Sequence, residues 1–178
     1  AKFDKDSAGT LNLGKEGGHS ENRVVHHKDQ TGQEIQRAIS HQVHQKSNIL
    51  VLDYHLAIDL ITENNHCLGA YVLDEKTNEI LTFQSDFTVL ATGGIGHLYG
   101  HTTNPVIATG DGIAMAYRSK AEVKEMEFIQ FHPTVLYDAT TGTSFLISEA
   151  VRGFGAHLRT KNGHRFMLDY DDRGDLAS

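Results

Sequence analysis

The sequence predicts an α/β fold that is α+β in part. Three observations support this: an apolar run ending in a glycine turn at Phe87–Gly94, a pair of short apolar segments between residues 68 and 83, and apolar residues at helical spacing after Thr31. A buried strand that runs into a glycine turn is typical of the ligand-binding edge of an α/β sheet. We therefore expect a sheet-based ligand site, with helices alternating with strands.

Composition limits the classes of function. The chain has 178 residues, 39% apolar content and a formal net charge of -7 at pH 7, so it can form a core but offers no basic surface for nucleic acid. Cys67 is its one cysteine, which leaves no internal disulfide and favours a cytoplasmic location. No apolar run suits a membrane span and no leader opens the chain. It starts without Met and ends in an unfinished loop, so we expect a fragment.

The first regular elements are predicted between residues 24 and 44. Val24–His26 is branched and apolar enough for a short strand. Thr31 and Glu34 have the spacing of a capping box, and apolar residues then recur on one face, so a helix is expected. His41 and His44 share a face of this helix. A solvated polar face explains them better than half a metal site, and no metal is expected.

A series of strands is predicted next. Asn48–Leu52 and Leu56–Ile61 have strand composition, and the first is expected to be buried on both faces. Leu68–Leu73 and Ile80–Phe83 are separated by a polar turn and form a β-meander. Phe87–Gly94 is the buried strand that enters the glycine turn.

Glycines mark two candidate ligand positions in the middle of the chain. Gly94 and Gly96 begin a dinucleotide fingerprint, but its third glycine is missing, so the chain does not contain its own pyrophosphate-binding turn. A second helix is predicted over residues 113–118, after Thr109–Gly112. Asp111 is either the N-cap of this helix or a group that holds a ligand hydroxyl at the helix N-terminus.

The stretch Glu127–Thr134 combines polar and aromatic side chains. Gln130, His132 and Thr134 would project to one face of an extended backbone, and Pro133 would end that strand. Two interpretations of His132 stay open on the pattern alone: a buried histidine satisfied by the backbone, or a side chain presented to a cavity.

The last part of the chain has a different character. Phe145–Val151 is predicted to be a short helix that carries Ser148 and Glu149, and Asn162–Gly163 is a hairpin signal. Glycine-rich polar segments replace buried strands after about residue 126. This change predicts one domain over residues 1–126 and a second over residues 127–178.

Several motifs in a fixed order carry a resemblance to a known family. They are Glu16–Ser20, Asp29–Glu34, Val89–Gly94, Thr102–Pro105, Gly110–Ala116, Glu127–Thr134, Glu149–Gly153 and Arg165–Met167. From Lys15 onward the chain resembles the succinate dehydrogenase and fumarate reductase flavoprotein family, and within it the L-aspartate oxidases. The resemblance implies that residues 1–126 are an incomplete Rossmann-like FAD-binding domain without the family's N-terminal G-x-G-x-x-G unit. Residues 127–178 would begin an α+β capping domain.

The resemblance also implies roles for particular residues. FAD would be faced by Asp111, by the backbone at Leu56 and Ala57, and by the turn Thr92, Gly93 and Gly94. A dicarboxylate substrate would meet Gln130, His132, Ser148 and Glu149. Glu16 matches a glutamate that selects L-aspartate over succinate, because a carboxylate attracts the α-ammonium by on the order of 1 to 4 kcal/mol at about 4 Å.

The implied reaction is transfer of a hydride from the α-carbon of L-aspartate to FAD, which gives iminoaspartate for de novo NAD biosynthesis. Oxygen or fumarate would reoxidise the flavin, and quinolinate synthase would take the product. The family's essential arginine would follow Ser178, so the separate chain is expected neither to turn over nor to hold FAD tightly.

Three positions depart from the family pattern. Lys15 replaces an arginine, Asn22 replaces a basic residue, and Phe154 stands where a glutamate is usual; the last implies altered packing of the cap over the flavin. Two alternative functions stay open: a succinate- or fumarate-linked flavoprotein, which Glu16 would distinguish, and a non-catalytic scaffold that binds a partner.

Overall fold

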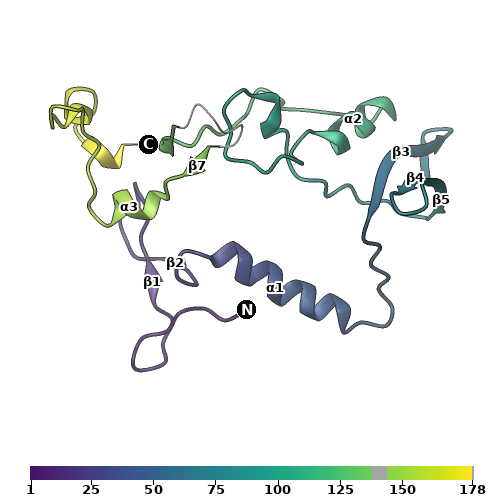
Figure 1. Cartoon of the computed structure of the whole chain (residues 1–178), viewed down its shortest axis with the longest axis horizontal. Helices are drawn as coiled ribbons and strands as arrows, with labels where there is room; N and C mark the ends of the chain where they lie inside the picture. The colour runs from purple at the N-terminus through teal and green to yellow at the C-terminus, as the bar shows by residue number, and fades with distance from the viewer. Residues whose placement is uncertain (138–143, 178) are drawn as a thin grey trace. The chain divides into compact units, whose positions relative to one another are not determined.

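The computed structural model describes residues 1–137 and 144–177, and Figure 1 labels their helices and strands. The chain divides into two compact units. The first unit combines Ala1–Leu50 with Leu146–Ser178, and the second is Val51–Phe145. The boundary expected after residue 126 falls inside the second unit, and the domain assignment itself stays a prediction.

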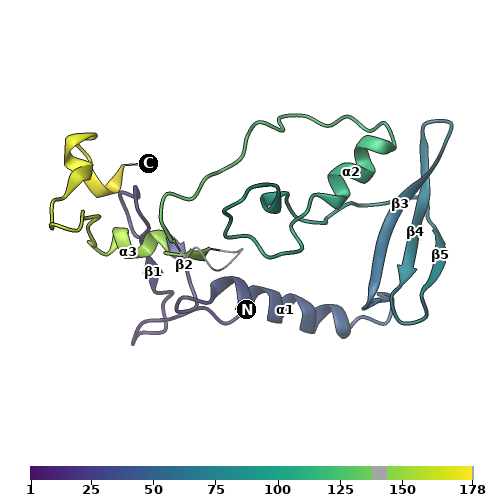
Figure 2. The same ribbon diagram turned by 45° about the horizontal axis from the view of Figure 1, so that its top comes forward.

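The first unit contains residues from both ends of the chain. Its elements are β1 (Leu13–Gly14), β2 (Val24–Val25), α1 (Thr31–His44), α3 (Glu149–Gly153) and the 3₁₀ helices η2 (Phe166–Asp169) and η3 (Gly174–Leu176). The strands β1 and β2 pair antiparallel, which confirms a strand at Val24. Figures 1 and 2 both show α3 beside these two strands.

The start of α1 differs from the expected capping box. Gln30 is the N-cap and makes no side-chain cap hydrogen bond. The Thr31 hydroxyl accepts a hydrogen bond from the His27 amide at 3.0 Å. The Glu34 carboxylate accepts from the Lys2 amide and from Arg37, both at 2.6 Å. Glu34 is thus buried against the N-terminal segment, and this tertiary contact replaces the local capping contact.

The second unit contains a three-stranded antiparallel sheet, whose strands lie side by side in Figure 2. Its strands are β3 (His55–Glu63), β4 (His66–Asp74) and β5 (Glu79–Gln84), in that order, so the predicted β-meander is confirmed. Gly69 in β4 has φ 141, and a Cβ there would overlap the carbonyl oxygen of Phe83. Glycine is therefore required at this position of the β4–β5 pair.

A helix and two short elements complete the second unit. They are η1 (Gly96–Leu98), α2 (Asp111–Arg118) and β6 (Val135–Leu136), and β6 pairs with β7 (Phe145–Leu146). Gly110, with φ 80, is the N-cap of α2, so Asp111 is the first helical residue and not the cap. Arg118 at the other end of α2 donates to Asp59 of β3 at 2.9 Å, which ties the helix to the sheet.

Some predicted elements are absent from the described residues. Asn48–Leu52, Phe87–Gly94 and Gln130–Thr134 lie outside any strand. Leu50, expected to be buried, is 79% exposed, and Phe87 is 89% exposed. A strand requires a neighbour for its backbone hydrogen bonds, and the described residues supply no neighbour to these segments.

Two local predictions near the end of the chain are also corrected. The helix expected from Phe145 begins only at Glu149, after the short strand β7. Gly163 does form a turn, with φ 87 and its amide bonded to the Thr160 carbonyl at 2.9 Å. No strands flank this turn among the described residues, so the Asn-Gly signal produced a turn without a hairpin ladder.

The hydrophobic core of the described chain is small. Its buried apolar residues are Ala108, Met115 and Ala177. The accessible surface is 13984 Å², whereas two separate compact domains of these sizes would expose about 10,400 Å². Many apolar side chains therefore contact solvent. Among the described residues, no helix has the length and apolar content needed to cross a membrane.

Candidate functional site

The predicted glycine turn packs against the first turn of α2. A Cβ at Gly112 would overlap the Thr92 hydroxyl, and one at Gly110 would lie 2.7 Å from Ile95 Cδ1. Gly93 has φ 76, and no atom lies within 4 Å of its Cβ position. The structure thus brings Thr92, Gly93 and Asp111 to one place, with an open backbone at the turn.

Asp111 is exposed at the N-terminus of α2. Its Oδ2 accepts a hydrogen bond from the Thr109 hydroxyl at 2.9 Å. The amides of the first helical turn have no partner within the helix, so a ligand here would meet both N–H donors and a carboxylate acceptor. Leu56 and Ala57 lie near the start of β3, and no contact described in the structure joins them to this turn.

A pocket of about 560 Å³ in the second unit gathers three of the predicted site residues. Gly94 from the glycine turn, together with Gln130 and His132, lines it. Aromatic rings form part of the wall: Tyr99 and Phe131 meet edge to face, with ring centroids 5.4 Å apart. The pocket therefore places a cofactor candidate and two substrate candidates on one cavity.

The imidazole of His132 is oriented by the backbone two residues later. Its Nδ1 lies 2.9 Å from the Thr134 carbonyl oxygen and 3.2 Å from the Thr134 amide nitrogen. The two interpretations of His132 left open by the sequence are thus compatible. The backbone holds Nδ1 while the residue lines the pocket.

Glu16, Ser148 and Glu149 come together in the first unit. The Gly17 amide donates to the Glu149 carbonyl at 3.2 Å, and a Cβ at Gly153 would lie 2.6 Å from the Lys15 carbonyl oxygen. The Glu16 segment therefore lies directly on α3. Ser148 caps this helix, because its Oγ accepts from the Ala150 amide at 3.2 Å.

A buried arginine, which the sequence did not single out, contacts the segment around Glu149. Arg152 is 6% exposed. Its Nη2 lies 3.3 Å from Glu149 Oε1, and its Nη1 donates to the carbonyl oxygens of Asp175 and Ala177 at 3.1 and 3.3 Å. A buried guanidinium requires such partners, and the two carbonyl partners come from a segment more than twenty residues away in the sequence.

Asp175 is the second buried charge that sequence reasoning missed. Its carboxylate is 4% exposed and accepts from the Leu158 amide at 2.8 Å, the Arg165 guanidinium at 2.9 Å and His157 Nδ1 at 3.0 Å. Burial opposes ionisation, but these three donors outweigh it and lower the pKa of the Asp175 carboxyl. Only its place in the Arg-Gly-Asp motif could have drawn attention to it.

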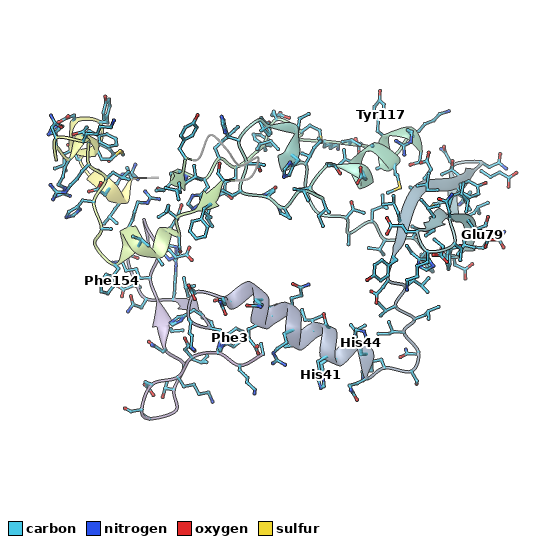
Figure 3. The ribbon with its side chains drawn as sticks, in the orientation of Figure 1. Phe3, His41, His44, Glu79, Tyr117 and Phe154 are labelled. Carbon is cyan, nitrogen blue, oxygen red and sulfur yellow. The ribbon has the colours of Figure 1, made fainter. Side chains whose placement is uncertain are left out.

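The remaining candidates are solvent-facing. Figure 3 shows His41 and His44 on α1, and His44 Nδ1 lies 2.7 Å from the Ser40 carbonyl oxygen. The described residues contain no group of His, Cys, Asp and Glu suited to a metal ion. Phe154 is 97% exposed, so its departure from the family pattern is not explained by packing within the described chain.

The predicted site residues therefore form two sets, each described within its own unit. In the second unit, Gly94, Gln130 and His132 line the pocket, while Thr92, Gly93 and Asp111 lie together at the glycine turn. The corner set, in the first unit, is Glu16, Ser148 and Glu149. Leu56 and Ala57 belong to neither set.

Comparisons with known proteins agree on the kind of chain this is. A family model described as an FAD binding domain matches residues 1–178. The chloroplastic L-aspartate oxidase of Oryza sativa subsp. japonica is 48% identical, over 99% of this chain and 29% of that enzyme. The L-aspartate oxidase of Acinetobacter baylyi is 46% identical, over 99% of this chain and 34% of that enzyme. The chain thus spans about a third of the length of these relatives.

Solved structures give the same result for the fold. A quinol fumarate reductase from E. coli superposes with a TM-score of 0.86 and 30% identity, over 94% of this chain and 28% of that chain. A quinol-fumarate reductase with menaquinol molecules gives a TM-score of 0.87 and 31% identity, with the same coverage. The fold is therefore that of an FAD-binding domain with mixed helices and sheets.

Proposed function

Because the chain belongs to the FAD-binding domain family of the succinate dehydrogenase and fumarate reductase flavoproteins, we propose that the protein carrying it is an FAD-dependent L-aspartate oxidase. FAD is the cofactor of this family. The observation that carries the proposal is the pocket lined by Gly94, Gln130 and His132. We also propose that residues 1–126 belong to a Rossmann-like domain and residues 127–178 to a capping domain.

The residues at the glycine turn fit the cofactor. Gly93 and Gly94 present a backbone without side chains, and the turn lies against the N-terminus of α2. Asp111 suits a hydroxyl of the cofactor, since its carboxylate would repel a phosphate. When bound, FAD supplies the acceptor for the hydride that leaves the substrate α-carbon. Leu56 and Ala57 remain candidates on the resemblance alone.

His132 and Gln130 would bind a substrate carboxylate. Nδ1 of His132 lies within hydrogen-bond distance of both the carbonyl oxygen and the amide nitrogen of Thr134, so the backbone sets the orientation of the ring. Because the backbone fixes the ring, little side-chain entropy is lost when the carboxylate binds.

On the resemblance, Ser148, Glu149 and Glu16 are also substrate residues. Ser148 accepts the Ala150 amide through its oxygen, which leaves its hydroxyl proton available to a carboxylate. Glu16 would attract the α-ammonium. As the α-carbon hydride leaves, the nitrogen loses a proton and a carbon–nitrogen double bond forms, which gives iminoaspartate.

Charge removal at Glu16 tests the proposal. In the FAD-loaded full-length protein, Glu16→Gln is expected to lower kcat/KM for L-aspartate roughly 5-fold to 900-fold, which corresponds to about 1 to 4 kcal/mol. Flavin binding should not change. Glu21→Gln, at an exposed acid nearby, is the matched control and should leave kcat/KM unchanged. The measurement is peroxide production with L-aspartate, beside binding of succinate and fumarate.

Two outcomes separate the alternatives. Unchanged L-aspartate kinetics in Glu16→Gln would contradict the assignment, and so would loss of L-aspartate use without better binding of succinate or fumarate. Turnover of succinate or fumarate alone by the unmodified protein would favour the second candidate, a succinate- or fumarate-linked flavoprotein. The superposition on fumarate reductase is the observation that supports this candidate. Absence of flavin uptake by the full-length protein would favour a non-catalytic scaffold.

Three further parts of the proposal rest on the resemblance. We propose that the reaction serves NAD biosynthesis, that quinolinate synthase takes the product, and that the protein is cytoplasmic. The relatives from Oryza sativa and Arabidopsis thaliana are chloroplastic, so a fluorescent fusion of the full-length protein is the direct test of location.

A further inference from the structure

We infer that Asp175 is a positioning residue that holds Glu16 in place through Arg152. This inference rests on the selectivity role proposed for Glu16. Asp175 and Glu16 have no direct contact among those described. The connection passes through the backbone carbonyls of residues 175–177, the Arg152 guanidinium and the glycine pair that follows Glu16.

The first step of this connection is the anchoring of Asp175. Its two carboxylate oxygens face three donors: the Leu158 amide on Oδ1, and Arg165 and His157 on Oδ2. Hydrogen bonds to a charged acceptor are roughly twice as strong as neutral ones. Because the carboxylate is almost fully buried, these bonds fix the course of η3 relative to residues 157–165.

The second step joins η3 to Arg152. The Asp175 carbonyl accepts from Arg152 Nη1 at 3.1 Å, and the Ala177 carbonyl accepts from the same nitrogen at 3.3 Å. The guanidinium is rigid and planar. Two carbonyls from one short segment therefore determine where its plane lies.

The third step joins Arg152 to the Glu16 segment. A Cβ at Gly17 would lie 3.4 Å from Arg152 Nη2, and one at Gly18 would lie 3.7 Å from the Leu176 carbonyl oxygen. The glycine pair thus lies beside both the guanidinium and η3, with no room for side chains much larger than a methyl group on these sides. The Gly17 amide is held by the Glu149 carbonyl at 3.2 Å. A shift of η3 would move the backbone that directly follows Glu16.

Asp175→Asn is the informative change because it keeps the shape of the side chain. An amide has one oxygen, so either the Leu158 amide or the pair Arg165 and His157 would face an NH₂ group in place of an acceptor. A buried donor without an acceptor is costly, and η3 is expected to move. Asp171→Asn is the matched control. It removes a carboxylate paired with Arg173 at 2.9 Å in the same segment, where the two side chains are 31% and 62% exposed.

The experiment uses the FAD-loaded full-length protein. Asp175→Asn is expected to raise KM for L-aspartate about tenfold with kcat changed less than about twofold, which is the signature of lost substrate binding. In the Glu16→Gln background, Asp175→Asn should add almost nothing, because residues that act as one unit are not additive. Asp171→Asn should leave both constants unchanged.

The outcomes distinguish this inference from the proposed function. If the unmodified protein does not oxidise L-aspartate, the proposed function fails. If it does, an unchanged KM in Asp175→Asn or full additivity with Glu16→Gln overturns the role of Asp175. If Asp175→Asn does not fold, Arg165→Gln removes one donor of the three. It is expected to raise KM about threefold and to be non-additive with Glu16→Gln, and an unchanged KM there also overturns the inference.

Discussion

Substitution of Gly112 tests whether the glycine turn and α2 form one cofactor-binding element. A methyl group at this position would overlap the Thr92 hydroxyl and lie 3.0 Å from Thr92 Cβ. Rotation of the Thr92 side chain does not relieve the second contact, because Cβ stays in place. The turn must therefore shift away from the helix.

The size of the effect follows from two opposing contributions. Alanine in place of glycine in a helix is favourable by up to about 1 kcal/mol, whereas overpacking costs about 1 to 3 kcal/mol. Gly112→Ala is therefore expected to lower the free energy of unfolding by roughly 1 kcal/mol. If the shifted turn also lowers the free energy of FAD binding by about 1.4 kcal/mol, FAD would bind about tenfold more weakly.

The assay compares two helical glycines at equivalent positions. Gly32 is the second residue of α1, as Gly112 is of α2, and no atom lies within 4 Å of its Cβ position. Gly32→Ala should stabilise the protein slightly and leave the flavin titration unchanged. If Gly112→Ala binds FAD with the affinity of the unmodified protein and gains stability as Gly32→Ala does, the inferred contact between turn and helix is wrong.

Other predictions concern the fold and the separate chain. The hydrogen bonds from Arg37 and then the Lys2 amide lower the Glu34 pKa from 4.5 to about 2. Their stabilisation is present above pH 4.5 and lost as pH falls through about 2, so urea unfolding of Glu34→Gln should depend less on pH in this range than that of the unmodified protein. Gly69→Ala should lower the free energy of unfolding by about 3 kcal/mol or more, measured by urea denaturation, since it meets both a strained φ and the Phe83 carbonyl; a loss below about 1 kcal/mol would contradict the register of β4 and β5. The separate 178-residue chain should show neither flavin absorbance nor peroxide output with L-aspartate, and a yellow, active preparation would contradict this.

Local patterns in the sequence predicted the elements whose partners are close in the chain. The β-meander from Leu68 to Phe83 and the helix after Thr31 formed as expected, because a hairpin ladder and a helical turn are closed by near neighbours. The run Phe87–Gly94 formed no strand, although Gly93 has a positive φ of 76. Its strand character depends on neighbours that local sequence cannot supply.

For the candidate site, too, the sequence predicted some features and the structure added others. The motifs by themselves predicted Glu16, Asp111, Gln130 and His132 as site residues, because those residues lie in the motifs that carry the family resemblance. The structure showed how they are held: His132 by the nearby Thr134 backbone, and the segment after Glu16 by the distant Arg152 and η3. It also revealed Asp175, which an isolated Arg-Gly-Asp motif does not distinguish from a surface acid. The physical reason is that burial of a charge and the donors that make it tolerable come from segments far apart in the sequence, and only the folded chain brings them together.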